Sequence, residues 1–120
     1  MKDQTIITEA TKKKVLERQR GLSITGMWLG RGVNYHHCIT SGLGEKGVGY
    51  EWNVVALTPE EHRQYHDKAE HIGRYTFQEF ETLMFNHLKI KYPMWSKDKC
   101  KVKKGYEEKD YGVYQDKIKR

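Results

Sequence analysis

The chain has 120 residues, of which 37% are hydrophobic and 32% are charged. This length suits one domain rather than two, and the composition argues against an intrinsically disordered chain. The formal net charge of +6 favours a polyanionic partner such as nucleic acid, although a basic structural protein has the same balance.

The cysteines and the N-terminus indicate a cellular compartment. Cys38 and Cys100 lie far apart without a CxxC spacing, which argues against a disulfide framework and a cysteine-based zinc ribbon. The N-terminal stretch "MKDQTIITEA" has no apolar signal core, and no apolar run approaches the length of a membrane span. We therefore expect a cytoplasmic protein with reduced thiols and no membrane partner.

The first half of the chain reads as a helix followed by strands. Good helix formers run from a Thr8 cap to Arg20, and Gly21 can stop them. Short β-prone stretches surround Ile24 and residues 33–37. A glycine-rich connection at residues 42–49 then leads to the strand-like run "YEWNVVAL".

The second half begins with two helix signals. Thr58, Pro59 and Glu61 form a capping box that predicts a helix from Pro59 to about residue 69. Thr76 and Glu79 repeat the signal before an amphipathic stretch that ends ahead of Pro93. Residues 96–120 are lysine-rich without clear periodicity. The predicted fold class is α+β, as one domain over residues 1–120: helix, β-hairpin, helix, helix, basic tail.

Four of the six histidines fall into two pairs on these elements. His62 and His66 are four residues apart on a predicted helix, so one helix face offers two ring nitrogens to a single metal ion. His36 and His37 are adjacent on a predicted strand, so their side chains point to opposite sides. One of them can complete the metal set and the other is available as a base. The alternative is a set of solvated surface histidines with one packed imidazole.

The order "HH", then Asn53, then "HRQYH" resembles the HNH endonuclease family, whose fold is the ββα-metal finger. The resemblance covers about residues 20–70 and is strongest to histidine-rich members such as the nuclease domains of DNase colicins. Residues 76–92 resemble the helical extension of small phage-encoded HNH proteins. The resemblance implies an α+β ββα-metal core with flanking helices, in a protein that a phage expresses in the host cytoplasm.

The resemblance also implies a role for each residue of the motif. His36, His62 and His66 would bind one divalent metal, His37 would be the general base, and Asn53, on the second strand, would bond across the hairpin. Hydrolysis of a phosphodiester needs a base that titrates near neutral pH and a cation on the scissile phosphate. The family's reaction leaves a 5′-phosphate and a 3′-hydroxyl.

This sequence departs from the family in two ways. It lacks the cysteine pairs that bind a structural zinc in many members, so we expect packing by Trp28, Leu29, Trp52 and the helix that begins at Phe77 to replace that ion. It also has His36 where many members have aspartate. Three imidazoles favour Zn²⁺, Ni²⁺, Co²⁺ or Mn²⁺ over Mg²⁺, and the identity of the metal stays open.

Basic residues near the motif are candidates for binding nucleic acid. Arg31 and Arg63 are placed to hold the scissile phosphate, and Lys46 either contacts phosphate or is solvated. Lysines at 12–14 and 97–104 can neutralise backbone phosphates. The tail tyrosines either stack on bases or belong to a tail that docks on the domain; they are Tyr106, Tyr111 and Tyr114.

The remaining motifs have simpler interpretations. "GLGEKG" matches GxGxxG, but a strand rather than a helix follows it, which argues against a dinucleotide site. We expect Cys38 to be a small buried residue and His87 to be a packed or rim histidine. His71 is an outer group near the metal or a residue at a helix C-terminus.

The sequence as a whole predicts a metal-dependent HNH endonuclease that acts on DNA as a monomer or homodimer, with a phage packaging or recombination protein as a possible partner. The alternative is a non-catalytic, metal-bound module on the same finger that binds nucleic acid or protein. A third hypothesis is a basic structural protein without a metal, for which chelators would leave melting unchanged.

Overall fold

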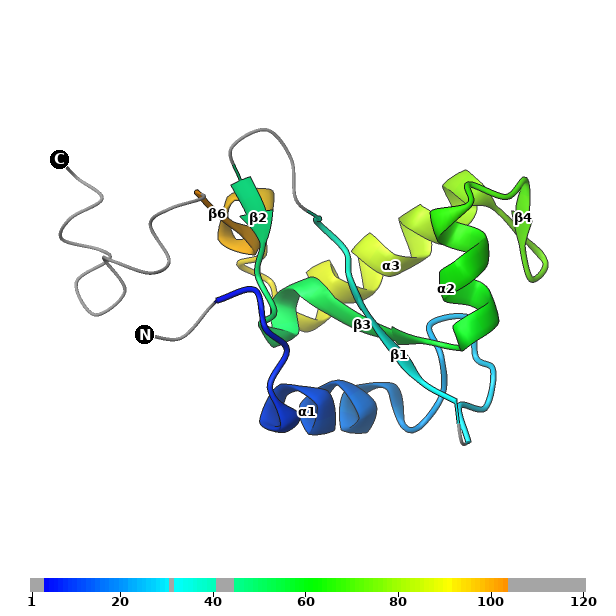
Figure 1. The fold of residues 1–120 in the computed structure, drawn as a ribbon, viewed down its shortest axis with the longest axis horizontal. Helices are drawn as coiled ribbons and strands as arrows, with labels where there is room; N and C mark the ends of the chain where they lie inside the picture. The colour runs from blue at the N-terminus through cyan, green and yellow to red at the C-terminus, as the bar shows by residue number, and fades with distance from the viewer. Residues whose placement is uncertain (1–3, 31, 41–44, 104–120) are drawn as a thin grey trace, which may run out of the picture.

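Three α-helices and three two-stranded antiparallel sheets make up the part of the chain that the computed structural model describes, residues 4–30, 32–40 and 45–103 (Figure 1). The predicted α+β class is confirmed. The helices and short 3₁₀ turns are α1 (Glu9–Gln19), η1 (Glu51–Asn53), α2 (Pro59–His66), α3 (Phe77–Lys91) and η2 (Lys97–Cys100). The strands are β1 (Asn34–His37), β2 (Glu45–Gly47), β3 (Val54–Leu57), β4 (His71–Ile72), β5 (Tyr75–Thr76) and β6 (Lys101–Lys103).

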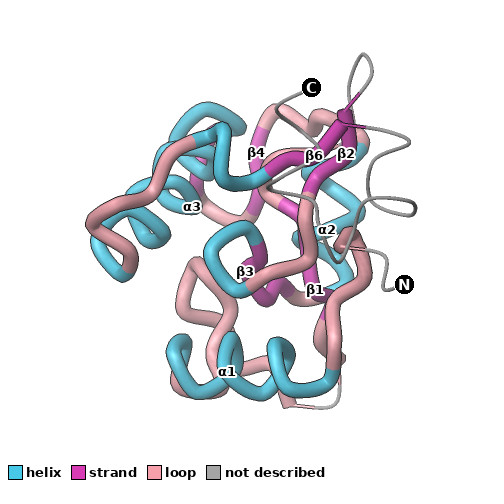
Figure 2. The backbone as a smooth tube through the Cα atoms, turned by 90° about the vertical axis from the view of Figure 1, so that its left-hand side faces the viewer, coloured by secondary structure: helices cyan, strands magenta, loops and turns pink. Residues whose placement is uncertain are grey.

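The antiparallel pair β1–β3 is the centre of the fold, with His36 opposite Val55 and His37 opposite Val54. Because side chains alternate along a strand, this register sends the two histidines to opposite faces of the pair. All four residues of β3 are buried, since α1 covers one face and α3 the other (Figure 2).

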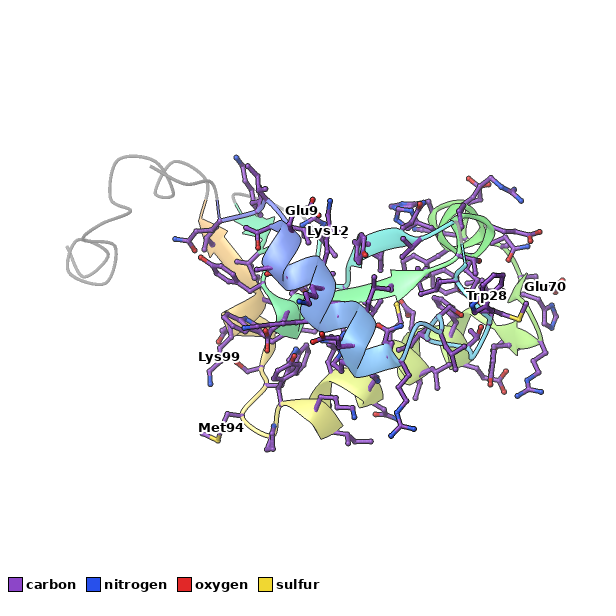
Figure 3. The ribbon with its side chains drawn as sticks, turned by 90° about the horizontal axis from the view of Figure 1, so that it is seen from below. Glu9, Lys12, Trp28, Glu70, Met94 and Lys99 are labelled. Atoms are coloured by element: carbon purple, nitrogen blue, oxygen red, sulfur yellow. The ribbon has the colours of Figure 1, made fainter. Side chains whose placement is uncertain are left out.

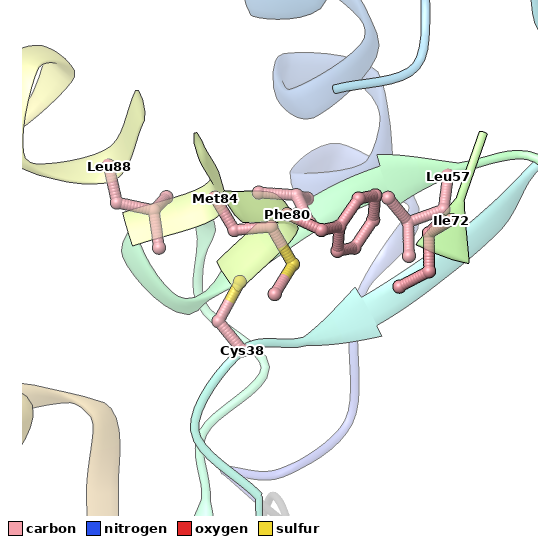
Figure 4. Close-up of a cluster of buried hydrophobic side chains, with 7 residues drawn as sticks. Cys38, Leu57, Ile72, Phe80, Met84 and Leu88 are labelled. Atoms are coloured by element: carbon pink, nitrogen blue, oxygen red, sulfur yellow. The ribbon is translucent and has the colours of Figure 1, made fainter. Parts of the chain in front are cut away.

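Two apolar clusters hold these layers together. One lies between the strands and α3 and comprises Cys38, Val55, Leu57, Ile72, Phe80, Met84 and Leu88 (Figure 4). The other lies on the α1 side and comprises Val15, Leu29, Val54 and Ala56. On that side, Arg18 and Gln19 of α1 also donate to the carbonyls of Val54 and Ala56 at 2.6 and 3.0 Å. The second edge of β3 thus obtains hydrogen bonds from side chains instead of a third strand.

The predicted helix starts are confirmed by their caps. The Thr8 hydroxyl accepts from the Thr11 amide at the start of α1. Thr58 and Thr76 each form a complete capping box with the glutamate three residues later. Helix α2 ends at His66, earlier than the predicted residue 69, and Lys68 then adopts a left-handed conformation with φ 54°.

Several sequence expectations for the strands and the tail were wrong. Ile24 lies in a turn, not a strand, and residues 51–53 of "YEWNVVAL" form the 3₁₀ turn η1. The glycine-rich connection contains strand β2, which pairs with β6 from the start of the predicted tail. Gly47 of β2 allows the backbone of Ile39 to approach closely, since a Cβ at this position would lie 1.9 Å from the carbonyl oxygen of Ile39. The tail tyrosines lie outside the described residues.

The packing expected to replace a structural zinc is only partly present. Leu29 is buried, and Trp52 is half-buried with its indole Nε1 donating to the carbonyl of Lys99. Trp28, in contrast, is 78% exposed, so the prediction that it packs in the core was wrong. It lies at the same end of the molecule as Glu70, opposite the end that carries Met94 and Lys99 (Figure 3). Within the described ranges, no helix is both long and apolar enough to cross a bilayer.

Candidate metal centre

Three histidines from a strand and a helix come together on the face of β1 that is turned toward α2. His36 contributes from β1, and His62 and His66 contribute from successive turns of α2. At least one ligand atom of each residue lies within 4.8 Å of the others, and among the described residues this is the group of histidine, cysteine and carboxylate side chains suited to a metal ion. The two strands β1 and β3 followed by α2 form a ββα unit around it.

The ring geometry suits a metal ion. The Nε2 atoms of His62 and His66 are 3.1 Å apart. Two nitrogens that each lie about 2.0–2.1 Å from a tetrahedral Zn²⁺ are about 3.3 Å from each other, so this pair is already near ligand spacing. The His36 ring centroid is 5.2 Å from that of His62 and 5.8 Å from that of His66.

The environment of His36 also fits a metal ligand. The residue is 2% exposed, and its buried Nε2 has no hydrogen-bond partner among the residues that the structure describes. Burial, followed by the charges of His62, His66 and His37, lowers the pKa of His36 to about 3. Burial and the charges of His66 and His37 also lower the pKa of His62. A metal binds the neutral ring, and the lowered pKa values keep both imidazoles neutral at neutral pH.

The ligand helix is fastened at its first turn by a buried carboxylate. Glu61 is 5% exposed and accepts from the Thr58 amide through one oxygen. Its other oxygen accepts from the hydroxyls of Ser23 and Thr25, in the loop that precedes β1. Glu61 therefore fixes α2 to that loop, and this fixes the position of His62 one residue further along.

His37 lies on the other face of β1, close enough to the cluster for its charge to lower the pKa values of His36 and His62. Its Nε2 is 2.8 Å from the carbonyl oxygen of Thr5, in the segment before α1. A carbonyl only accepts, so Nε2 carries the hydrogen and Nδ1 is the bare nitrogen of the neutral ring. His37 also lines a surface cavity of about 270 Å³ with Thr5, Thr40 and Gly47. This histidine can accept a proton from a molecule bound there.

Asn53 holds the chain between β1 and β3. It is fully buried in η1, directly before β3 rather than on the strand. Its Oδ1 accepts from the Ile39 amide at 2.8 Å, and its Nδ2 donates to the carbonyls of Ile39 and Val48 at 3.0 and 2.8 Å. These bonds tie the residues that follow His37 to the turn before β3.

The predicted phosphate-binding residues lie at separate positions. Arg63 is exposed on α2 beside His62, 3.9 Å from both Glu60 and Asp67. Lys46 is half-buried on β2, opposite Val102. Arg31 lies outside the described residues.

Three further candidates stand apart from the metal group. His71 is exposed on β4, and His87 is half-buried on α3. Cys38 is buried, as predicted, and burial raises the pKa of its thiol. A protonated thiol inside an apolar cluster is a poor nucleophile.

Two hydrogen-bond partners of the site histidines were not predicted from the sequence. The Asn34 amide lies 2.9 Å from Nδ1 of His62, and the Thr5 carbonyl contacts His37. Strand alternation places Asn34 on the same face as His36, two residues away, so this spacing was a usable signal. The Thr5 contact uses a main-chain atom, which no residue type reveals.

Comparisons with protein-family models, with curated proteins and with solved structures find no match to this chain. The interpretation of the site therefore rests on its own geometry: three imidazoles placed for a metal ion, and a fourth that lines a cavity on the other side of β1.

Proposed function

We propose that this chain is a metal-dependent endonuclease of the HNH type that hydrolyses DNA phosphodiester bonds. The observation that supports the proposal is the arrangement of four histidines. His36, His62 and His66 form the ligand group. His37 donates through Nε2 to the Thr5 carbonyl, which leaves Nδ1 as the proton acceptor. A divalent cation held by the three imidazoles would stabilise the charge that develops on the phosphate and on the leaving oxygen.

The residues of the chain supply the remaining steps. His37 Nδ1 removes a proton from a water molecule, whose oxygen forms a bond to phosphorus as the bond from phosphorus to the 3′-oxygen breaks. The Thr5 carbonyl holds the ring in the tautomer that this step needs and stabilises the imidazolium that results. Asn53 maintains the backbone next to the base through its bonds to Ile39.

The charge of the surface supports a polyanionic substrate. Helix α1 carries Lys12, Lys13 and Lys14 and packs on the face of the strands to which His37 also points. Arg63 lies on the ligand helix. Such residues neutralise backbone phosphates without reading base sequence, so we expect binding to weaken steeply with salt.

A plasmid-nicking assay tests the proposal. Purified protein is incubated with supercoiled DNA across Mg²⁺, Mn²⁺, Co²⁺, Ni²⁺, Zn²⁺ and EDTA, with His37→Ala as the test variant and His71→Ala as the matched control. We expect metal-dependent nicking by the wild type and by His71→Ala. His37→Ala should lose about 100-fold or more of the rate while it binds the metal normally.

Other outcomes would overturn the endonuclease proposal. Cleavage that persists in His37→Ala would exclude this base. Tight metal binding without cleavage of any DNA form would instead favour a metal-bound binding module on the same ββα unit.

A further inference from the structure

The ring of His62 has a second polar contact, on the side away from the ligand group. Asn34 and His36 lie two residues apart on β1, so both side chains face α2. Asn34 is paired with Leu57, directly before the Thr58 cap of α2, which places it beside the beginning of the ligand helix. Its amide Nδ2 is 2.9 Å from Nδ1 of His62.

The orientation of the Asn34 amide is coupled to which nitrogen of His62 carries the hydrogen. With the NH₂ group of Asn34 toward Nδ1, the amide donates, Nδ1 accepts, and the hydrogen of the neutral ring is on Nε2. That hydrogen then lies between the rings, where Nε2 of His62 is 3.1 Å from Nε2 of His66. In this state His62 has no free lone pair on the nitrogen that faces the ligand group.

Metal binding requires the opposite tautomer. Nε2 of His62 must be bare, so its hydrogen must move to Nδ1 and needs an acceptor there. A carboxamide offers a donor at one end and an acceptor at the other, and a half-turn about its last bond exchanges them. Asn34 can therefore support either tautomer from the same position.

We propose that Asn34 is a positioning residue for the metal centre, which holds His62 in its Nδ1–H tautomer by turning its amide oxygen toward that nitrogen when a metal is bound. This inference rests on the proposed function only in that His36, His62 and His66 bind a metal. It assigns to Asn34 a contribution to affinity without a bond to the metal.

The neutral amide has a specific consequence. A carboxylate at the same place would accept from Nδ1–H permanently, whereas the amide also stabilises the metal-free arrangement. The isosteric change Asn34→Asp should therefore bind metal as tightly as the wild type or more tightly. Asn34→Leu keeps the approximate volume but removes the acceptor, and loss of such a partner lowers metal affinity about 10- to 100-fold.

The experiment combines metal titrations with a direct measurement of the tautomer. Competition titrations with Zn²⁺ and Co²⁺ are run on the wild type, Asn34→Leu, Asn34→Asp and the exposed control Asn86→Leu. The ¹⁵N shifts of the His62 ring are recorded in the full chain with and without Zn²⁺. We expect Asn34→Leu to lose about 10- to 100-fold in affinity, and Asn34→Asp and the control to lose less than about threefold.

The ring shifts should show hydrogen on Nε2 without metal and on Nδ1 with Zn²⁺. Because metal binding at Nε2 requires Nδ1–H whatever its partner, the wild-type test of Asn34 itself is the contact between its side-chain NH₂ protons and the His62 ring, which Zn²⁺ should abolish. A wild type in which the Asn34 NH₂ protons stay in contact with the His62 ring when Zn²⁺ is bound, or an Asn34→Leu variant of equal affinity, would overturn the role of Asn34 alone. A wild type that binds none of the metals would overturn both this inference and the metal centre.

Discussion

At the scale of single residues, Asn53 combines complete burial with complete use of its amide. Its oxygen and nitrogen bond to three main-chain groups of Ile39 and Val48, of which the Val48 carbonyl is in a buried contact and the two Ile39 groups are in partly buried contacts. An unpaired buried polar group costs more than the net value of the bond it has lost. Asn53 therefore contributes to stability as well as to the geometry next to the base.

Replacement of Asn53 by alanine should be strongly destabilising. We expect Asn53→Ala to lower the free energy of unfolding by about 2–4 kcal/mol, because it leaves the Ile39 and Val48 groups unpaired. Urea denaturation measures the change. Asn86→Ala, at an exposed position of α3, should stay within about 0.5 kcal/mol of the wild type. Equal effects of the two substitutions would contradict the prediction.

His87 makes stability depend on pH from a position outside the metal centre. Its Nε2 is buried and has no hydrogen-bond partner within the described part of the chain. Burial, together with the charges of Arg18 and Lys91, lowers the pKa of His87 from 6.5 to about 4. Between these values the unfolded chain binds a proton at His87 that the folded chain does not. Stability should therefore fall as the pH drops from 6.5 toward 4, and this contribution should level off below.

The variant His87→Phe isolates the effect. It removes the titrating group and fills the same position with an apolar ring, so its stability relative to the wild type should increase as the pH falls. Denaturation midpoints at pH 7, 5.5 and 4 give this difference, in which all other titrating groups cancel. A constant difference across these three values would show that His87 does not contribute.

At the scale of elements, α2 and α3 begin with the same capping box but differ in length and in what they carry. Helix α2 has 8 residues and holds two of the metal ligands, whereas α3 has 15 residues and supplies apolar side chains to the core. The stability of a short helix depends more on its cap. Four backbone groups at each helix end have no intrahelical partner, and these groups are a larger share of a helix of 8 residues than of one of 15.

Removal of the two caps should separate stability from metal affinity. Thr58→Ala and Thr76→Ala each lose one bond to the amide three residues later, at 3.0 and 3.1 Å, and each should cost about 1 kcal/mol. Only Thr58→Ala should also weaken metal binding, because it loosens the helix that positions His62 and His66. Calorimetric titration with Zn²⁺ is the measurement. Equal affinities in the two variants would show that the cap does not affect the ligands.

The elements also show what can be predicted from the sequence. The helix starts were predictable because a capping box is a local signal. Strand and helix periodicity predicted that His62, His66 and one of the two adjacent histidines share a site, and the choice of His36 came from the resemblance to the HNH family. The pairing of β2 with β6 was not predictable, since each strand has three residues and they are joined by a contact between distant parts of the chain. The exposure of Trp28 could not be predicted either, because hydrophobicity alone does not determine which large side chains a small core can accept.

At the scale of the whole molecule, metal and folding should be linked. The three ligands come from β1 and α2, so an ion that binds all of them joins a strand to a helix from a different part of the sequence. A ligand that binds only the folded state stabilises it by RT ln(1 + [L]/Kd), which is about 2.7 kcal/mol at 100 times Kd.

Thermal unfolding tests this linkage. At such a Zn²⁺ concentration the melting temperature should rise by roughly 10 °C, and EDTA should reverse the rise. His66→Ala should remove most of the shift, and His71→Ala should retain it, because His71 lies outside the ligand group. A melting temperature that is insensitive to metal and chelator would support the hypothesis of a basic protein without a metal.

The contact between His37 and Thr5 limits what mutagenesis can reveal. The acceptor is a peptide oxygen, so every amino acid at position 5 supplies the same atom. Substitutions at position 5 should therefore not reveal the role of that oxygen. Chemical protein synthesis can change it. An α-hydroxy acid at position 6 would convert the amide carbonyl of Thr5 into an ester carbonyl, a weaker acceptor, and would leave every side chain around the base in place.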